Sequence, residues 1–303
     1  MIGLRRFLAT TLLACATAHA GPASPLLQYA AAHPAPADAA QRRIDDSRAR
    51  LPELEAQLER LAKPRVGVSS AGADVFETPP DILAAGYDQK GYHLAILERR
   101  EDAIAAWHEA LRLAPQELRY WSDIGSELER LARDGEAEDA FAKAIAGDEP
   151  DAQALQAAAA HHLGSAQWQR VVDLARRKAS PESSADDTAY LELYAIIAAR
   201  ALGADPAEFA PLDADDSWTG ALAAFALGES DESALLAKIE ASGGSDANDR
   251  LCEALFYAGA LAEARGERDA AVAYYRATLA RGVRAFVEHV HAERALRRLA
   301  APG

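Results

Sequence analysis

Small and aromatic residues return at a step of 34 positions along the middle of this 303-residue chain. The recurring pairs are Gly91 and Gly125, Ala103 and Ala137, and Trp107 and Phe141. A pattern that repeats at a fixed step of about 20 to 50 residues is typical of proteins built from stacked structural units. The chain is therefore expected to form an array in which each unit packs on its neighbours.

Each recurring residue type has a packing reason in a unit of two antiparallel helices. The glycine of the first helix is expected to face the alanine of the second, where the backbones approach too closely for a larger side chain. The aromatic residue fills the space towards the next unit. Pro115 and Pro150 end the second helices. Together these features are those of the tetratricopeptide repeat.

The expected fold is all-α, a tetratricopeptide superhelix (α-solenoid) of about five to six helical hairpins with a C-terminal capping helix. Alanine and leucine, the two best helix formers, dominate the apolar residues. Near the C-terminus, Gly259, Ala271 and Tyr275 repeat the offsets of 12 and 16 residues found in the first unit. We expect an array with a degenerate end over 80–216 and a C-terminal module with its cap over 217–303.

The first twenty residues have the features of a secretory signal peptide. Arg5 and Arg6 provide a positive start, and an apolar stretch follows over 7–16. A small-residue cleavage site then ends at Ala20. Residues 1–20 are therefore expected to be removed during export to the periplasm.

A second cleavage site is possible at Cys15. The preceding residues, Leu12-Leu13-Ala14, resemble the lipobox whose cysteine is acylated in bacterial lipoproteins. Cleavage there would tether the protein to the outer membrane, whereas cleavage after Ala20 would leave Cys252 as the single cysteine, expected in the core. No later stretch reaches about 18 uninterrupted apolar residues, so no transmembrane segment is expected.

Residues 21–79 are expected to form an N-terminal arm, irregular over 21–40, and a capping helix. Apolar residues at heptad spacing suggest a coiled coil and a possible homodimer. They are Ile44, Leu51, Leu54, Leu58 and Leu61. Pro52 argues against this, because an interior proline costs about 3 kcal/mol and kinks or restarts a helix. A helix that covers the first repeat is the simpler interpretation.

The charge balance restricts the class of partner. The net charge is −15, and removal of Arg5 and Arg6 with the signal peptide makes it −17. Such a chain repels nucleic acid and anionic lipid. A basic or neutral protein partner is expected, and no nucleic acid.

The segment from Trp218 to Leu299 resembles the C-terminal part of NlpI-like envelope lipoproteins. The likeness lies in FALGESDESALLAKIEAS, LCEALFYAGALAEARGERDAAVAYY and FVEHVHAERAL, and includes Trp218, Gly259, Gly266 and Glu288-His289. That family is all-helical, sits in the periplasm on the outer membrane, and scaffolds peptidoglycan hydrolases or presents them to a protease. The resemblance implies a similar adaptor role here, and a structural role in the cap for Glu288 and His289.

The first helices of a solenoid line its concave face, where partners bind. Counting from repeat starts near 84, 118 and 152 places nine candidate protein-binding residues there. They are Asp88, Tyr92, Arg119, Ser122, Ser126, Glu129, Arg130, Gln153 and Gln156. Both charges, amides and a tyrosine suit an extended peptide held by side-chain hydrogen bonds.

Two groups of histidines could instead indicate a catalytic or metal site. His289 and Glu293 stand four residues apart on an expected helix, which permits a metal-dependent hydrolase, but a catalytic zinc normally has three protein ligands. His161 and His162 are adjacent and are not expected to share one helix face. No nucleophile elbow or nucleotide-binding motif appears in the sequence. The protein is thus expected to have no catalytic residues, metal or cofactor.

The leading hypothesis is a non-catalytic periplasmic adaptor or scaffold that binds envelope proteins such as peptidoglycan hydrolases or proteases in its concave groove. An outer-membrane-tethered assembly factor for export or surface-polymer machinery is the first alternative. The hydrolase that uses His289 and Glu293 is the second.

Overall fold

A computed structural model of the protein describes residues 24–36, 39–69, 72–210 and 217–301. The signal peptide predicted over 1–20 and its Cys15 lie outside the described residues. Within the described residues, no helix combines the length and the apolar composition needed to cross a membrane.

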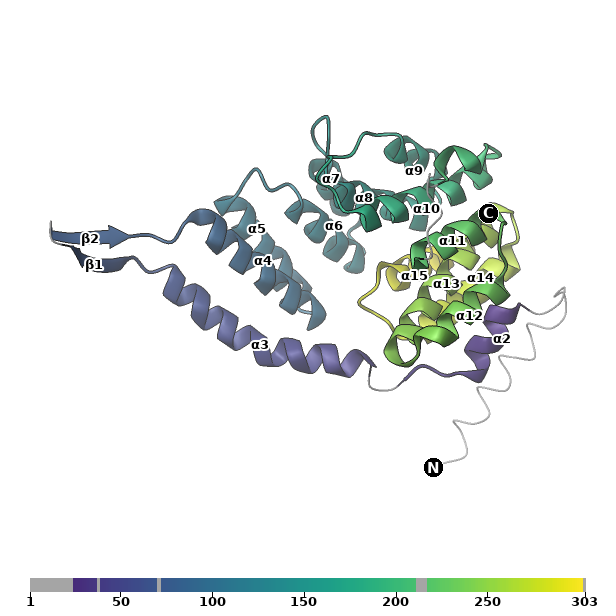
Figure 1. The fold of residues 1–303 in the computed structure, drawn as a ribbon, viewed down its shortest axis with the longest axis horizontal. Coiled ribbons are helices and arrows are strands. Elements are labelled where there is room, and N and C mark those ends of the chain that lie inside the picture. Colours follow the sequence, from purple (N-terminus) through teal and green to yellow (C-terminus); the bar gives the residue numbers. More distant parts are fainter. Residues whose placement is uncertain (1–23, 37–38, 70–71, 211–216, 302–303) are drawn as a thin grey trace, which may run out of the picture.

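Helices make up most of the described chain (Figure 1). The first half contains α2 (Pro25–Ala32), α3 (Ala39–Leu61), α4 (Pro80–Ile96), α5 (Arg100–Leu113), α6 (Tyr120–Arg130), α7 (Asp134–Ala144), α8 (Ala152–Gly164) and α9 (Trp168–Ala175). The second half contains α10 (Ala185–Leu202), the 3₁₀ helix η2 (Pro206–Phe209), α11 (Trp218–Leu227), α12 (Glu232–Ser242), α13 (Gly244–Ala264), α14 (Arg268–Ala280) and α15 (Val287–Ala300). The expected all-α class is confirmed.

One β-hairpin interrupts the helices. Its strands β1 (Arg65–Ser69) and β2 (Gly72–Phe76) are antiparallel, with Arg65 opposite Phe76. The hairpin projects from the end of the molecule where α3 is joined to α4 (Figure 1). This hairpin is absent from the predicted fold, but it lies in a connection and leaves the helical array unchanged.

The same turn joins the helices of the successive hairpins α4–α5, α6–α7 and α8–α9. In each turn one non-glycine residue has a positive φ, 58° at Glu98, 56° at Ala132 and 55° at Ala166. Such values are uncommon outside glycine, and these three stand 34 residues apart (132 − 98 and 166 − 132). Gly266 has a φ of 75° in the turn of α13–α14. The 34-residue period therefore extends to α8–α9, where Ala175 replaces the aromatic residue.

Three hairpins bring a glycine against an aromatic ring. A Cβ atom added to Gly91 would lie 2.5 Å from Trp107, one added to Gly125 2.8 Å from Phe141, and one added to Gly259 2.9 Å from Tyr275. The matching alanines, Ala103, Ala137 and Ala271, are fully buried. The ring of the second helix reaches across and supplies the atoms nearest to the glycine in each hairpin.

The last helix does not cap the far end of the array. Helix α15 begins and ends within one residue of the predicted 286–299, but the chain turns back and packs it against α6, α8, α13 and α14. Figure 1 shows α15 near the middle of the molecule, on the inner side of the curved array. Part of the groove that the sequence predicted is therefore filled by the chain itself.

The N-terminal arm is partly helical, which corrects the irregular structure expected over 21–40. Ser24 caps α2 by accepting a hydrogen bond from the Leu27 amide at 3.1 Å, and Pro25 occupies the first turn. Ser24 Oγ also donates to Glu232 at 2.5 Å, and Leu26 is completely buried. Helix α2 is thereby docked on α12, α13 and α14 of the C-terminal module.

Helix α3 covers the first hairpin by packing on α4, as the simpler interpretation of the heptad leucines expected. Leu51, Leu54 and Leu58 are buried within the chain, and Leu58 lies over Gly86. The helix runs through Pro52 instead of restarting there, because buried leucines before and after the proline hold its two halves on the same partner.

Candidate functional site

A small cleft opens between α6, α8 and α15. Its volume is about 140 Å³. The lining residues are Ser122, Asp123, Ser126 and Glu129 from α6, Gln153, Gln156, Ala157 and Ala160 from α8, and Val287 and His291 from α15. Five of the nine residues predicted to bind a partner are therefore brought together in one place.

The helical period explains which residues reach the cleft. Ser122, Ser126 and Glu129 are spaced by four and three residues, so they lie on one face of α6. Asp123 belongs beside them, and its position three residues before Ser126 could have revealed it. Val287 had no such local signal, because α15 reaches the cleft only through the tertiary fold.

Glu129 is buried in a polar network instead of being free for a partner. It is 4% exposed, with His161 Nδ1 2.6 Å from Oε1 and His291 Nε2 3.3 Å from Oε2. Arg294 also ion-pairs with Oε1. Burial acts to raise the pKa of Glu129, but the charge of His291 and the hydrogen bonds from His161 and His291 outweigh it and hold that pKa well below its usual range. Glu129 thus stays ionised and anchors α15.

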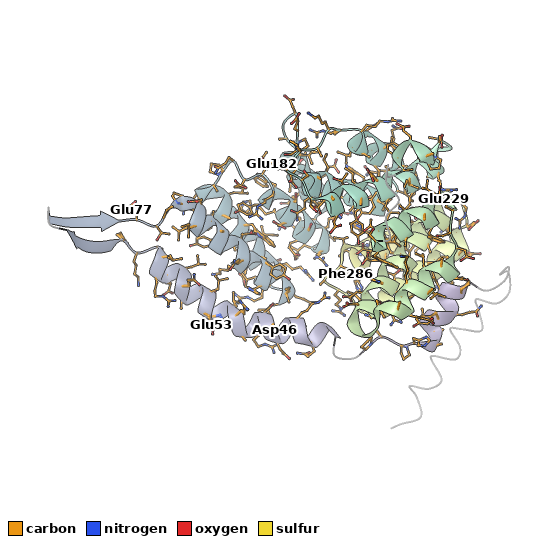
Figure 2. All side chains as sticks on the ribbon, viewed as in Figure 1. Asp46, Glu53, Glu77, Glu182, Glu229 and Phe286 are labelled. Atoms are coloured by element: carbon orange, nitrogen blue, oxygen red, sulfur yellow. The ribbon has the colours of Figure 1, made fainter. Side chains whose placement is uncertain are left out.

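Arg130 has a similar anchoring role. It donates to the carbonyl oxygens of Arg284 at 2.6 Å and Ala285 at 2.9 Å, and it lies 3.2 Å from Glu127. These bonds hold the segment that leads into α15. Phe286, at the end of this segment, lies in the middle of the molecule (Figure 2).

The three candidates nearest the N-terminal end of the array lie outside the cleft. Asp88 accepts a hydrogen bond from Trp107 Nε1 at 3.0 Å and pairs with Arg119 at 3.1 Å. Tyr92 is 59% exposed on α4. Of the nine predicted residues, five therefore line the cleft, Arg130 holds the segment before α15, and Asp88, Tyr92 and Arg119 lie outside the cleft.

Two polar groups of the cleft lack a partner. Ser122 is 5% exposed, yet its Oγ has no hydrogen bond among the described residues. The Asp123 carboxyl makes no hydrogen bond or ion pair with any described residue. Ser126 donates to the Ser122 carbonyl at 3.0 Å, and Gln156 donates to Tyr194 at 3.2 Å.

The surroundings of Asp123 favour its neutral form. Burial and the negative charge of Asp88 raise its pKa from 3.8 to about 7, against the opposing effect of Arg119. A positive group from outside would reverse this balance, because an opposite charge within about 4–6 Å favours the ionised carboxylate. The cleft is thus suited to a cationic hydrogen-bond donor.

A second buried acidic network lies in the C-terminal module. Glu253 accepts hydrogen bonds from Tyr190 at 2.7 Å and Trp218 at 3.2 Å, and Glu288 accepts one from Tyr257 at 2.7 Å. Burial and the charge of Glu288 raise the pKa of Glu253 to about 8. Through these bonds Trp218 and Glu288 link α11 and α15 to α13.

The remaining candidate residues lie outside the lining of the cleft. Cys252 is fully buried, as expected of a small core residue. His289 Nε2 lies 3.6 Å from Glu293, within the single helix α15. His161 and His162 were not expected to share one helix face. Both are nevertheless buried, and both face the same glutamate, Glu138 on α7.

No protein-family model matches the chain, and a search of curated proteins found no match to it.

Proposed function

We propose that this protein is a non-catalytic, exported adaptor of the tetratricopeptide type, which holds a partner protein by taking one of its lysine or arginine side chains into the cleft. The observation that supports this most directly is the pair of unpartnered groups, Ser122 Oγ and the Asp123 carboxyl. Buried polar groups cost free energy unless they are hydrogen-bonded. A ligand that satisfies them recovers that free energy.

The size of the cleft favours one side chain over a whole small molecule. Sites for small molecules have volumes of about 300 to 1,000 Å³, whereas this cleft measures about 140 Å³. The end of a lysine or arginine fits such a space, and the rest of the partner would lie on the rim. Gln153 is exposed at that rim.

The charge of the molecule supports a basic partner. The net charge of −15 attracts cationic proteins over long range. Glu129, held ionised at the back of the cleft, adds a fixed negative charge. Arginine or lysine is therefore favoured over an acidic or apolar side chain.

The partner we propose is an envelope protein such as a peptidoglycan hydrolase or a protease, and the location we propose is the periplasm. The support is the signal-like segment over 1–20 and the resemblance of Trp218–Leu299 to NlpI-like proteins. The turns at Glu98, Ala132 and Ala166 support the tetratricopeptide assignment, since their 34-residue spacing is that of this repeat.

Capture from envelope extract tests the cleft. The mature wild-type protein and the Asp123→Asn variant serve as baits, with Asp46→Asn as the matched control. Asp46 is exposed on α3, away from the cleft, and undergoes the same loss of charge (Figure 2). We expect a partner retained by the wild type and by Asp46→Asn and lost with Asp123→Asn.

The identified partner then provides the second arm of the test. Changing its contacting lysine or arginine to glutamine is expected to abolish capture by the wild-type cleft. Equal capture by the wild type and by Asp123→Asn would overturn the cleft as the binding site. Intact mass of the mature protein decides the tether separately, because a free Gly21 terminus rules out acylation at Cys15.

A further inference from the structure

Three metal-binding atoms converge at the junction of α7 and α8. His161 Nε2 lies 3.2 Å from Glu138 Oε2, and His162 Nδ1 lies 3.8 Å from the same oxygen. All three ligand atoms lie within 4.8 Å of one another. This cluster is separate from the cleft and from the pair His289 and Glu293.

The hydrogen-bond partners of His161 leave its Nε2 without a proton to donate. The ionised Glu129 carboxylate lies 2.6 Å from His161 Nδ1, so the ring proton belongs on Nδ1. Arg294 also lies 3.1 Å from Nδ1, but its own proton is directed to Glu129. In the neutral ring, Nε2 then presents a lone pair to Glu138 Oε2, which is itself an acceptor.

His162 adds a second ring nitrogen at the same point. Its Nδ1 is buried and has no hydrogen-bond partner among the described residues, and the residue is 7% exposed. Two ring nitrogens and one carboxylate oxygen thus face one small volume, a set of atoms that a cation between them would satisfy.

We propose that Glu138, His161 and His162 bind a divalent transition-metal ion, with zinc the best match. Imidazole nitrogens and a carboxylate are ordinary zinc ligands, at about 2.0–2.2 Å from the metal. Tetrahedral ligands at that distance are about 3.3 Å apart, close to the separations of 3.2 and 3.8 Å. Three protein ligands leave a fourth position for water or an external ligand.

The groups around the cluster fit this assignment. Glu129 on His161 Nδ1 is the carboxylate partner that zinc-binding histidines commonly have, and it orients the ring. Arg170 ion-pairs with Glu138 through Oε1, the other carboxylate oxygen, which leaves Oε2 facing the histidines. Glu138 is 38% exposed, so an ion can enter from solvent.

The competing arrangement places a proton where the metal would be, with His161 as an imidazolium shared between Glu129 and Glu138. An imidazolium has no lone pair on Nε2 to offer, so the two arrangements are distinguished by whether the protein takes up a stoichiometric metal ion.

The test is a titration of the mature, chelator-treated full-length protein with Zn²⁺ alone and, for its absorption spectrum, with Co²⁺ alone. We expect one ion per chain and an intense visible Co²⁺ band, as four-coordinate sites give. Glu138→Gln and His162→Gln should each weaken binding at least about tenfold. His289→Gln is the matched control, because it removes an equally buried histidine near an acid, and it should bind as the wild type does.

Circular dichroism of each variant shows whether it folds, and Glu138→Gln at its half-exposed position preserves size and hydrogen bonding. Binding that is unchanged in Glu138→Gln or in His162→Gln overturns the proposal. So does a wild-type protein that takes up no stoichiometric Zn²⁺, or a loss of binding in His289→Gln.

Discussion

Asp123→Asn is expected to stabilise the protein, and to do so increasingly as the pH rises. The folded protein raises the pKa of Asp123 from 3.8 to about 7, through burial and Asp88. A carboxyl whose folded pKa is raised contributes stability that is complete below its unfolded pKa and is lost as the pH rises through the folded value. Asparagine keeps the size of the side chain and has no charge to bury.

The magnitude follows from the shift. About three pKa units at about 1.4 kcal/mol each give about 4 kcal/mol as the upper limit of the cost above pH 7. Near pH 5 only about 1.5 kcal/mol of this cost is present, because the unfolded carboxyl is already mostly ionised while the folded one is still neutral, and the cost grows until the pH passes the folded pKa. The gain from Asp123→Asn should therefore grow by about 2 to 3 kcal/mol between about pH 5 and pH 8.

Urea unfolding at a series of pH values measures this gain directly. The difference between variant and wild type isolates Asp123 from Glu253, whose raised pKa of about 8 makes the wild type lose stability over an overlapping range. Asp46→Asn should show no such trend. A gain that is constant with pH, or a variant less stable than the wild type at about pH 8, would refute the reasoning. Since the same variant should lose its partner, stability and binding are expected to oppose each other at this residue.

Three further substitutions, one of them with Gly135→Ala as its control, test the architecture. Glu129→Gln should lower the free energy of unfolding by about 3–5 kcal/mol, because it leaves buried cations unpaired. Since the pKa of Glu129 is lowered in the folded protein, this loss should be full above about pH 4.5 and should shrink as the pH falls. The same urea assay measures it. Gly125→Ala should lower stability by about 1–3 kcal/mol by overpacking against Phe141. Its control is Gly135→Ala, which should be neutral or stabilising because the added Cβ meets nothing within 4 Å. Equal melting temperatures for these two variants would contradict this reasoning. Ser24→Ala should cost about 1 kcal/mol by uncapping α2, seen as faster proteolysis near that helix.

The anchoring roles of Glu129 and Arg130 change how the binding face should be tested. A triple replacement of the charged candidates Arg119, Glu129 and Arg130 would release α15 from α6, so a loss of partner capture could come from unfolding alone. The single change at Asp123 avoids this, because that side chain bonds to no described residue.

The sequence by itself determined the helical hairpins. The spacing of Gly91, Trp107 and their counterparts is local, since each pair lies within one hairpin and reflects one close approach of two helices. For the same reason the period predicted which face of α6 and α8 points inward, and so most of the cleft.

Only the tertiary structure decided what fills that inner face. His291 meets Glu129 across 162 residues of sequence, and Ser24 meets Glu232 across 208. Contacts over such separations depend on complementary surfaces and leave no periodic signal in either segment. The adjacent His161 and His162 show the same limit, because helical spacing alone separates their side chains, whereas the Glu138 carboxylate of a neighbouring helix lies within reach of both.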